Sequence, residues 1–159
     1  MATREHHYSV GVRWTGNTGS GTSTYSGYSR EHEIEIPGKP TIIGTADPAF
    51  RGTDDLHTPE DLLVAALSQC HMLSYLALAA MSRINVVSYV DAATGTMVED
   101  RSQGTAQFTE VTLHPTVTIA EAALIDEAAA LHVRANQLCF IARSVNFPVQ
   151  HAAITLVRE

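Results

Sequence analysis

Residues 58–82 read TPEDLLVAALSQCHMLSYLALAAMS, and this stretch decides the fold. Thr58 can cap a helix, Pro59 suits the first helical position, and two acidic residues follow at the positive end of the helix dipole. From Leu62 to Ser82 there is no Asp, Glu, Lys or Arg, so the predicted helix is apolar on nearly every face. Such a helix is typical of the centre of a fold and not of its surface.

The uncharged stretch is also long enough to span a membrane. Its middle, however, is Ser68–His71, where four polar or reactive side chains stand next to one another. These groups would be costly at the midplane of a bilayer. The sequence therefore favours a buried helix of a soluble protein that has no membrane partner.

Composition limits the class of protein further. The chain has 159 residues, of which 45% are apolar and 17% charged, so we expect one folded domain over residues 1–159. The net charge of −7, with Lys39 as the only lysine, disfavours nucleic acid as a partner, because phosphate binding needs clustered positive charge. Two cysteines are too few for a disulfide scaffold, and the first residues lack the apolar run of a secretory signal. We therefore expect a cytoplasmic protein.

Periodicity on either side of the helix indicates short strands and further helical pieces. Strands are predicted at Tyr8–Trp14, around Thr24–Ser29, and at Glu31–Ile36, Asn85–Thr94, Ala106–Ile119 and Ala152–Val157, with helical pieces at Glu121–Asn136 and Leu138–Val145. The two strands after the central helix are expected to form a hairpin, whereas the long segment Pro37–His57 is expected to be an ordered, functional loop. This order predicts an α+β fold with antiparallel sheets around a long buried central helix.

Cys70 is the most reactive side chain in the predicted helix. A cysteine in an apolar helix is often inert packing, and burial raises the pKa of a thiol. Cys70 lies about three turns from the start of the helix, where the helix dipole no longer helps it ionise. His71 is a poor base for Cys70, because neighbours on a helix point about 100° apart. A reactive Cys70 therefore needs a cation from elsewhere, and Arg51, late in the long loop, is the obvious supplier.

Two sequence motifs carry a resemblance to a known family. Residues 58–71 (TPEDLLVAALSQCH) resemble the central-helix signature of the OsmC/Ohr family of thiol-dependent peroxidases, and Cys139, within ANQLCFIA at 135–142, falls where that family keeps its second cysteine. The order of strands and helices matches the family along essentially the whole chain. Arg51, which precedes Cys70 by 19 residues, resembles the arginine of the OsmC-like branch.

The resemblance implies an OsmC-like fold and a cofactor-free enzyme that reduces organic hydroperoxides to alcohols. It implies that Cys70 is the peroxidatic cysteine, Cys139 the resolving cysteine, Arg51 the activating cation and Glu60 the carboxylate that orients it. An external dithiol or lipoyl protein would then reduce the Cys70–Cys139 disulfide. Sequence separation alone leaves open whether the two sulfurs approach each other.

The position of Glu60 indicates a dimer. Ten helical residues separate its Cα from that of Cys70 by roughly 15 Å, and its side chain leans toward the helix N-terminus, away from Cys70. Antiparallel packing of two copies of the helix would instead bring Glu60 of one chain near Cys70 of the other. We therefore expect a two-fold dimer with shared active sites, which the resemblance implies to be intertwined.

Apolar residues near the reactive groups are candidates for substrate binding. Phe50, Met72, Leu73 and Phe140 are expected to line a pocket that favours organic over inorganic hydroperoxides. Phe140 departs from the family, which often has proline at this position.

Two alternative functions come from other classes. The first is a thiol-based sensor or small-ligand binder on the same fold, which would oxidise once and not turn over. The second is a metal site formed by His6, His7, His71 and the cysteines, but their spacing fits no ordinary zinc site. We expect no metal.

Overall fold

The computed structural model describes residues 4–159. Its contacts divide the chain into two compact units, Met1–Leu62 and Leu63–Glu159. Each unit is described by itself below. The expectation of a single domain over residues 1–159 stays a prediction.

The first unit contains an antiparallel sheet in the order β1-β2-β3. Its strands are β1 (Gly11–Trp14), β2 (His32–Glu35) and β3 (Ile42–Gly44). The predicted strand at Thr24–Ser29 is wrong, because these residues form turns, one of them closed by a 3.1 Å bond from the Gly27 amide to the Thr24 carbonyl. β1 pairs directly with β2, so the Ser- and Gly-rich connection between them has no neighbouring strand to pair with. β3, in contrast, lies inside the segment predicted to be irregular.

A short turn orders the segment that carries Arg51. The 3₁₀ helix η1 (Pro48–Phe50) is capped by Asp47, whose carboxylate accepts a 2.7 Å bond from the Ala49 amide. Arg51 follows in the left-handed conformation, with φ of 67°. The Gly52 amide then donates to the Asp47 carbonyl, and a Cβ on Gly52 would lie 1.4 Å from the Ala46 carbonyl oxygen, so only glycine fits there. The turn presents Arg51 in a fixed backbone geometry.

Helix α1 (Pro59–Met81) begins and ends close to the predicted residues. Thr58 and Asp61 cap it reciprocally: the Asp61 amide donates to the Thr58 hydroxyl at 3.2 Å, and the Thr58 amide donates to the Asp61 carboxylate at 3.0 Å. By length and composition alone, α1 is one helix in the described residues that is apolar enough to cross a membrane. The local capping signals explain why its start could be predicted from sequence.

The second unit contains two further three-stranded sheets, in the orders β4-β7-β9 and β5-β6-β8. The strands are β4 (Val86–Asp91), β5 (Thr94–Asp100), β6 (Thr105–Leu113), β7 (Pro115–Ile119), β8 (Val149–His151) and β9 (Ile154–Val157). β4 pairs antiparallel with β7 and β5 with β6, whereas β8 and β9 add to β6 and β7 in parallel. The predicted antiparallel pairing of 85–94 with 106–119 is confirmed for β4 and β7, but the two segments do not form a simple hairpin, because β5 and β6 lie between these strands in the chain. The second of those segments is two strands that meet at His114, and β5 and β8 were not predicted.

Helix α2 (Ile125–Leu138) confirms the amphipathic helix predicted after Glu121, preceded by the 3₁₀ turn η2 (Ala122–Leu124). Its buried stripe consists of Ala128, Leu131, His132 and Ala135. The predicted helical piece at 138–145 is reduced to the 3₁₀ turn η3 (Ala142–Ser144). Cys139, which ends α2, has extended backbone angles and so breaks the helix there.

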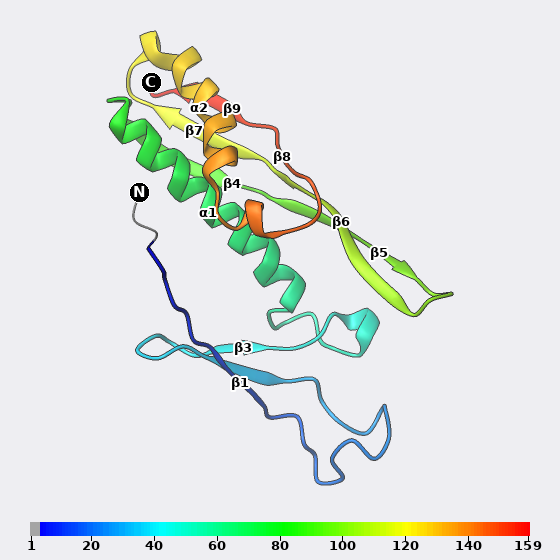
Figure 1. The fold of residues 1–159 in the computed structure, drawn as a ribbon. Helices are drawn as coiled ribbons and strands as arrows, with labels where there is room; N and C mark the ends of the chain where they lie inside the picture. The colour runs from blue at the N-terminus through cyan, green and yellow to red at the C-terminus, as the bar shows by residue number, and fades with distance from the viewer. Residues whose placement is uncertain (1–3) are drawn as a thin grey trace. The chain divides into compact units, whose positions relative to one another are not determined.

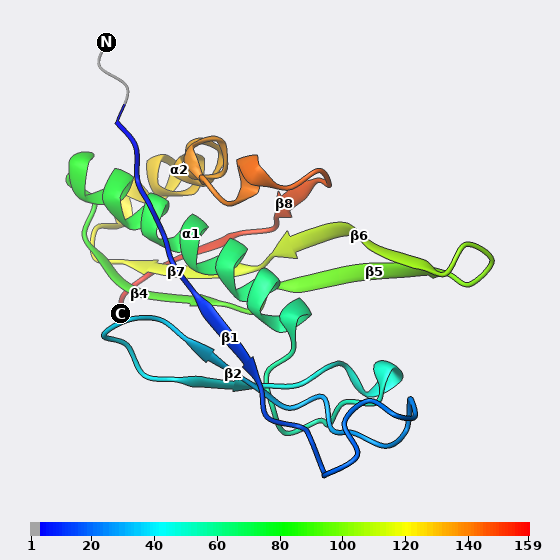
Figure 2. The same cartoon turned by 60° about the horizontal axis from the view of Figure 1, so that its bottom comes forward.

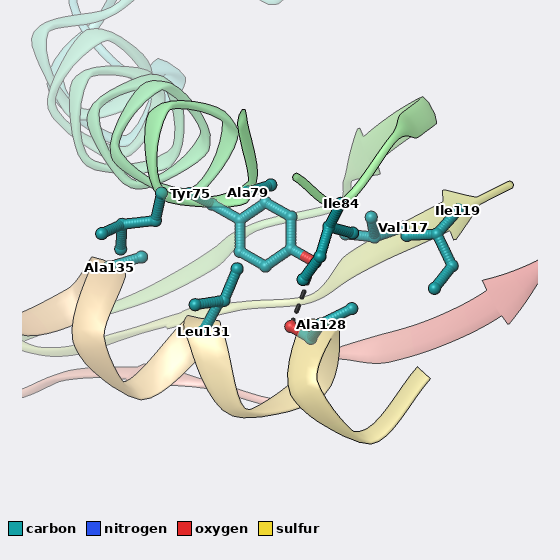
Figure 3. Close-up of a cluster of buried hydrophobic side chains, with 9 residues drawn as sticks. Tyr75, Ala79, Ile84, Val117, Ile119, Ala128, Leu131 and Ala135 are labelled. Carbon is teal, nitrogen blue, oxygen red and sulfur yellow. Dashed lines mark hydrogen bonds between the residues drawn. The ribbon is translucent and has the colours of Figure 1, made fainter. Parts of the chain in front are cut away.

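The main core of the second unit lies between α1, α2 and the sheet that contains β7. Both helices lie side by side on the same face of that sheet (Figures 1 and 2). Figure 3 shows Tyr75 at the centre of this cluster, between Leu131 and Ile84, with its hydroxyl donating a 3.1 Å bond to the Ala128 carbonyl. Tyr75 is fully buried and so belongs to the core of the second unit. A second cluster forms around Leu67, Val111 and Leu113.

The predicted α+β class is confirmed, but within this chain α1 buries one face only. Its buried residues are Leu67, His71, Tyr75, Leu78 and Ala79. On the opposite face, Leu73 is 60% exposed and Met81 is 73% exposed. An apolar helix face of this kind is one that soluble proteins normally cover.

Candidate active site

Two of the four polar residues in the middle of α1 have hydrogen-bond partners within the second unit. The Ser68 hydroxyl donates a 2.5 Å bond to the Asp91 carboxylate on β4, and His71 is hydrogen-bonded to His132 on α2. Cys70, which lies between them, is partly exposed and carries a free thiol, and Gln69 is exposed.

Cys139 lies at the end of α2 and is only 1% exposed. Its sulfur accepts a 3.4 Å hydrogen bond from the Ala142 amide at the start of η3. The pKa of the Cys139 thiol is raised to about 11, chiefly by burial and then by the neighbouring Cys70 side chain. The structure therefore places the two predicted cysteines next to each other, and both are free thiols.

An apolar pocket of about 600 Å³ opens beside Cys70. It is formed by the exposed face of α1 and by the segment that follows α2. Its lining residues are Ala66, Gln69, Cys70, Leu73, Ser74, Ala77, Leu78, Met81, Leu138, Phe140 and Ile141. None of these residues is charged, so the pocket favours uncharged, apolar ligands.

Of the four residues predicted to bind substrate, Leu73 and Phe140 line this pocket. Phe140 is 79% exposed, which leaves its ring free to contact a ligand. Met72 is half-buried and is not part of the lining, since it follows Cys70 on a different side of α1. Phe50 belongs to the first unit, where it is half-buried in η1.

Arg51 also belongs to the first unit, and its side chain is exposed. Its guanidinium carbon lies 5.3 Å from the centre of the Tyr25 ring. Among residues 4–159, no ion pair joins Arg51 to a carboxylate. The N–H groups of the guanidinium are thus not engaged by an acidic side chain of the described chain.

Glu60 lies in the first turn of α1, as predicted. One of its carboxylate oxygens, Oε2, is buried and has no hydrogen-bond partner in the described part of the chain. A buried carboxylate oxygen without a donor is costly, so this group calls for a cation or N–H donor from outside the described contacts.

A buried cluster of histidines was not predicted. His71 and His132 are fully buried and their rings are stacked, with Nε2 of His71 3.1 Å from Nδ1 of His132. His151 on β8 lies 5.6 Å from His71 and 5.9 Å from His132, measured between ring centres. The signal available in the sequence was the position of His132 within the apolar stripe of α2, where a polar ring is unusual.

The pKa values of this pair follow from its environment. The pKa of His71 and of His132 is lowered from 6.5 to about 4, chiefly by burial and to a smaller extent by the charge of His151. Both rings are therefore neutral at pH 7. In the described chain, residues 4–159, no group of three or more His, Cys, Asp or Glu side chains is arranged to hold a metal ion.

Comparison with known proteins gives two kinds of match. A family model described as OsmC-like protein matches residues 52–152. The solved structure of an OsmC-like protein of unknown function from Vibrio cholerae is 32% identical, with 94% of this chain and 100% of that chain covered and a TM-score of 0.84. A search of curated proteins found no match.

More distant structures share the fold. An organic hydroperoxide resistance protein from Elizabethkingia anophelis is 18% identical, with 98% of this chain and 100% of that chain covered and a TM-score of 0.67. An organic hydroperoxide resistance protein from Legionella pneumophila is 14% identical, with the same coverage and a TM-score of 0.66. The predicted fold is thereby confirmed.

Proposed function

Because this chain belongs to the OsmC-like protein family, we propose that it is a cysteine-based peroxidase that reduces organic hydroperoxides to alcohols. Two structural relatives are named for resistance to such compounds. The observation that carries the proposal is the contact between Cys70 and Cys139 beside an uncharged apolar pocket. The pocket supplies a place for an organic group, and the cysteine pair supplies two electrons.

The proposed cycle has three balanced steps. The thiolate of Cys70 attacks the terminal oxygen of the hydroperoxide, the O–O bond breaks, and the departing alkoxide takes up a proton to become an alcohol. The Cys139 sulfur then attacks the sulfenic acid of Cys70, forming a disulfide and releasing water. An external dithiol reduces this disulfide by thiol–disulfide exchange, which restores both thiols and oxidises the dithiol.

Unequal burial supports different roles for the two cysteines. Cys70 is partly exposed and lines the pocket, so a hydroperoxide can reach it. Cys139 is buried, and its raised pKa keeps it protonated at neutral pH, which makes it a poor first nucleophile. Its contact with Cys70 suits it to the second step, in which the partner sulfur is already adjacent.

Arg51 and Glu60 are proposed as the groups that activate Cys70 and orient the peroxide. A free thiol is already several per cent ionised at pH 7, so full ionisation gains only about ten- to thirtyfold in rate, partly offset by the lower nucleophilicity of a more acidic thiol. The larger contribution of Arg51 would be to hold the peroxide and to stabilise the negative charge that develops on its oxygens. Glu60, with its unpartnered buried oxygen, is suited to orient that guanidinium.

We propose that the active protein is a two-fold, intertwined dimer with shared active sites. Glu60 cannot easily reach Cys70 along its own helix, because the two Cα atoms are separated by roughly 15 Å. The exposed apolar face of α1, which includes Leu73 and Met81, offers a surface for a second copy. Analytical ultracentrifugation tests this: a monomer that keeps full activity at high dilution would refute the shared site.

Proteins of the OsmC-like family are soluble. We propose that this member works in the cytoplasm, since its two cysteines are free thiols and the proposed cycle needs a reducing environment. The reductant would be a small dithiol or a lipoyl protein. Reduction of the Cys70–Cys139 disulfide needs two electrons, and a dithiol supplies both.

The decisive experiment measures turnover of cumene hydroperoxide with dithiothreitol as reductant. We expect many cycles per protein molecule, no activity in Cys70→Ser, and a slower rate with hydrogen peroxide, which gains nothing from an apolar pocket. After one equivalent of hydroperoxide, mass spectrometry should find a peptide cross-linked through Cys70 and Cys139.

A thiol sensor or ligand binder would give a different result. It would oxidise once, in a stoichiometric reaction, and then recover slowly or not at all with the dithiol. That outcome would leave the redox chemistry of Cys70 in place but would reject an enzymatic role.

A further inference from the structure

Helices α1 and α2 meet through three polar contacts that run in register. Cys70 contacts Cys139, His71 is hydrogen-bonded to His132 at 3.1 Å, and the Tyr75 hydroxyl donates to the Ala128 carbonyl at 3.1 Å. Residue numbers rise along α1 as they fall along α2, so the two helices are antiparallel at this interface. Along this interface, the His71–His132 hydrogen bond is therefore the polar contact nearest to the two thiols.

Burying the His71–His132 pair costs more free energy than burying apolar side chains of similar size would. Nδ1 of His71 and Nε2 of His132 are buried and have no hydrogen-bond partner among residues 4–159. Two apolar side chains of similar size would leave no such atoms, and they would pack equally well against Tyr75, whose ring is stacked on His132 at 4.2 Å. What the histidines add is direction, since a hydrogen bond fixes the distance and rotation of one helix against the other.

We propose that His71 and His132 are positioning residues for the resolving step: their hydrogen bond holds the end of α2 so that Cys139 stays in contact with Cys70. This inference rests on the proposed peroxidase function. His71 adjoins Cys70 directly, and His132 lies two turns before Cys139 on the same helix. A shift of α2 that breaks the histidine contact therefore also moves Cys139.

A role as proton acceptor is disfavoured by magnitude. Burial leaves the pKa of each imidazole at about 4, whereas that of the Cys139 thiol is raised to about 11. Transfer of a proton from the Cys139 thiol to an imidazole this weakly basic is therefore strongly unfavourable. We therefore assign the pair a role through geometry; the rings that face it are those of His151 on β8 and Tyr75 on α1, and the charge of Asp91 on β4 acts on His71.

The test uses two variants of His132. His132→Phe deletes the hydrogen bond but keeps a ring to stack on Tyr75, and His132→Asn keeps a polar atom near the position of Nδ1. His114→Phe, the same change at an exposed histidine of the second unit, is the matched control. Circular dichroism and urea unfolding confirm that each variant is folded.

The first measurement needs no peroxide. Equilibrating the protein dithiol with reduced and oxidised glutathione gives the stability of the Cys70–Cys139 disulfide. We expect this equilibrium constant to fall about tenfold in His132→Phe, the equivalent of one lost hydrogen bond, and to stay within about threefold of wild type in His132→Asn and in the control.

The second measurement separates the two chemical steps. With cumene hydroperoxide, the rate at which Cys70 is oxidised should be unchanged in His132→Phe, while disulfide formation slows by about tenfold and a dimedone probe traps more sulfenic acid. Disulfide formation at the wild-type rate would overturn the proposal, as would equal slowing of both steps. If wild-type protein consumes no hydroperoxide, the proposed function fails, yet the glutathione equilibrium still tests the pair.

The reciprocal variant His71→Phe guards against a folding defect in α2. It should reproduce the loss of disulfide stability from the other helix. If both Phe variants fail to fold, the pair supports the core as a whole and the specific role in positioning Cys139 is rejected.

Discussion

Lowering the pH should destabilise this protein through two buried histidines, and the size of the effect can be worked out. The pKa of His71 and of His132 falls from 6.5 to about 4 on folding, chiefly because burial disfavours the charged ring. His151 adds positive charge that lowers both values, and Asp91 partly offsets this for His71. Tyr75 and Tyr89, the other titratable groups packed nearby, are neutral over this range because burial raises the pKa of each.

The sign follows from proton counting. Between pH 6.5 and about 4, the unfolded chain binds a proton on each imidazole and the folded chain does not. The unfolded state therefore gains stability as the pH falls through this window, and the folded protein keeps its full stability only above it. Each histidine should cost about 2 kcal/mol between pH 7.5 and pH 5, with a slope of about 1 kcal/mol per pH unit.

Urea unfolding followed by circular dichroism, at fixed protein concentration and with reductant present, measures this slope. Carboxylates also contribute, so the informative quantity is the difference between wild type and His132→Phe. Between pH 6 and pH 4.5, the free energy of unfolding of His132→Phe should depend on pH less steeply than that of wild type, by about 1 kcal/mol per pH unit. His114→Phe should keep the wild-type slope. An unchanged slope in His132→Phe would show that the His132 ring is not held neutral by burial.

Three further predictions concern the proposed cycle and dimer. Arg51→Lys should lose most of the peroxidase rate in stopped-flow assays, because a lysine lacks the fixed set of donors of a guanidinium; near-normal turnover would remove Arg51 from the mechanism. Cys139→Ser should stop at the sulfenic acid, seen as one added oxygen atom by intact-mass measurement, and a variant that still turns over would exclude Cys139 as the resolving residue. Phe140→Ala should raise KM for cumene hydroperoxide about three- to tenfold with kcat nearly unchanged, because apolar contact area is lost, and a matching change with hydrogen peroxide would contradict a role in binding the organic group.

Local sequence signals explain what could be predicted of the fold. The start of α1 is set by Thr58, Pro59 and Asp61, which lie within one turn of each other, and its position was predicted almost to the residue. α2 was predicted from its apolar stripe. Some failures were local, such as the strand predicted at Thr24–Ser29, but others are non-local: β8 is three residues long and pairs in parallel with β6. No pattern within such a segment indicates its partner.

In the candidate site, too, local features could be predicted from the sequence and contacts between distant residues could not. Cys70 could be singled out as the reactive group within its helix, but its contact with Cys139 depends on how α2 crosses α1. That crossing is determined by side chains such as Tyr75 and His132, which are separated by more than 50 residues in sequence. The family resemblance supplied the pairing of the cysteines, whereas the histidine contact beside them emerged only from the structure.

The unequal burial of the two thiols would let the proposed cycle run without a large rearrangement. Cys70 lines the pocket and Cys139 does not, so access and the raised pKa of Cys139 both favour oxidation of Cys70 first. Cys139 already lies next to Cys70 in the reduced state, so in the proposed cycle the sulfenic acid would form beside the thiol that resolves it. Further oxidation of Cys70 would then compete with intramolecular disulfide formation. Fast disulfide formation would require α2 to keep its position against α1 during every catalytic cycle. Under this proposal, the free-energy cost of two imidazole nitrogens that lack a partner among the described residues would be the cost of holding Cys139 in place for the resolving step.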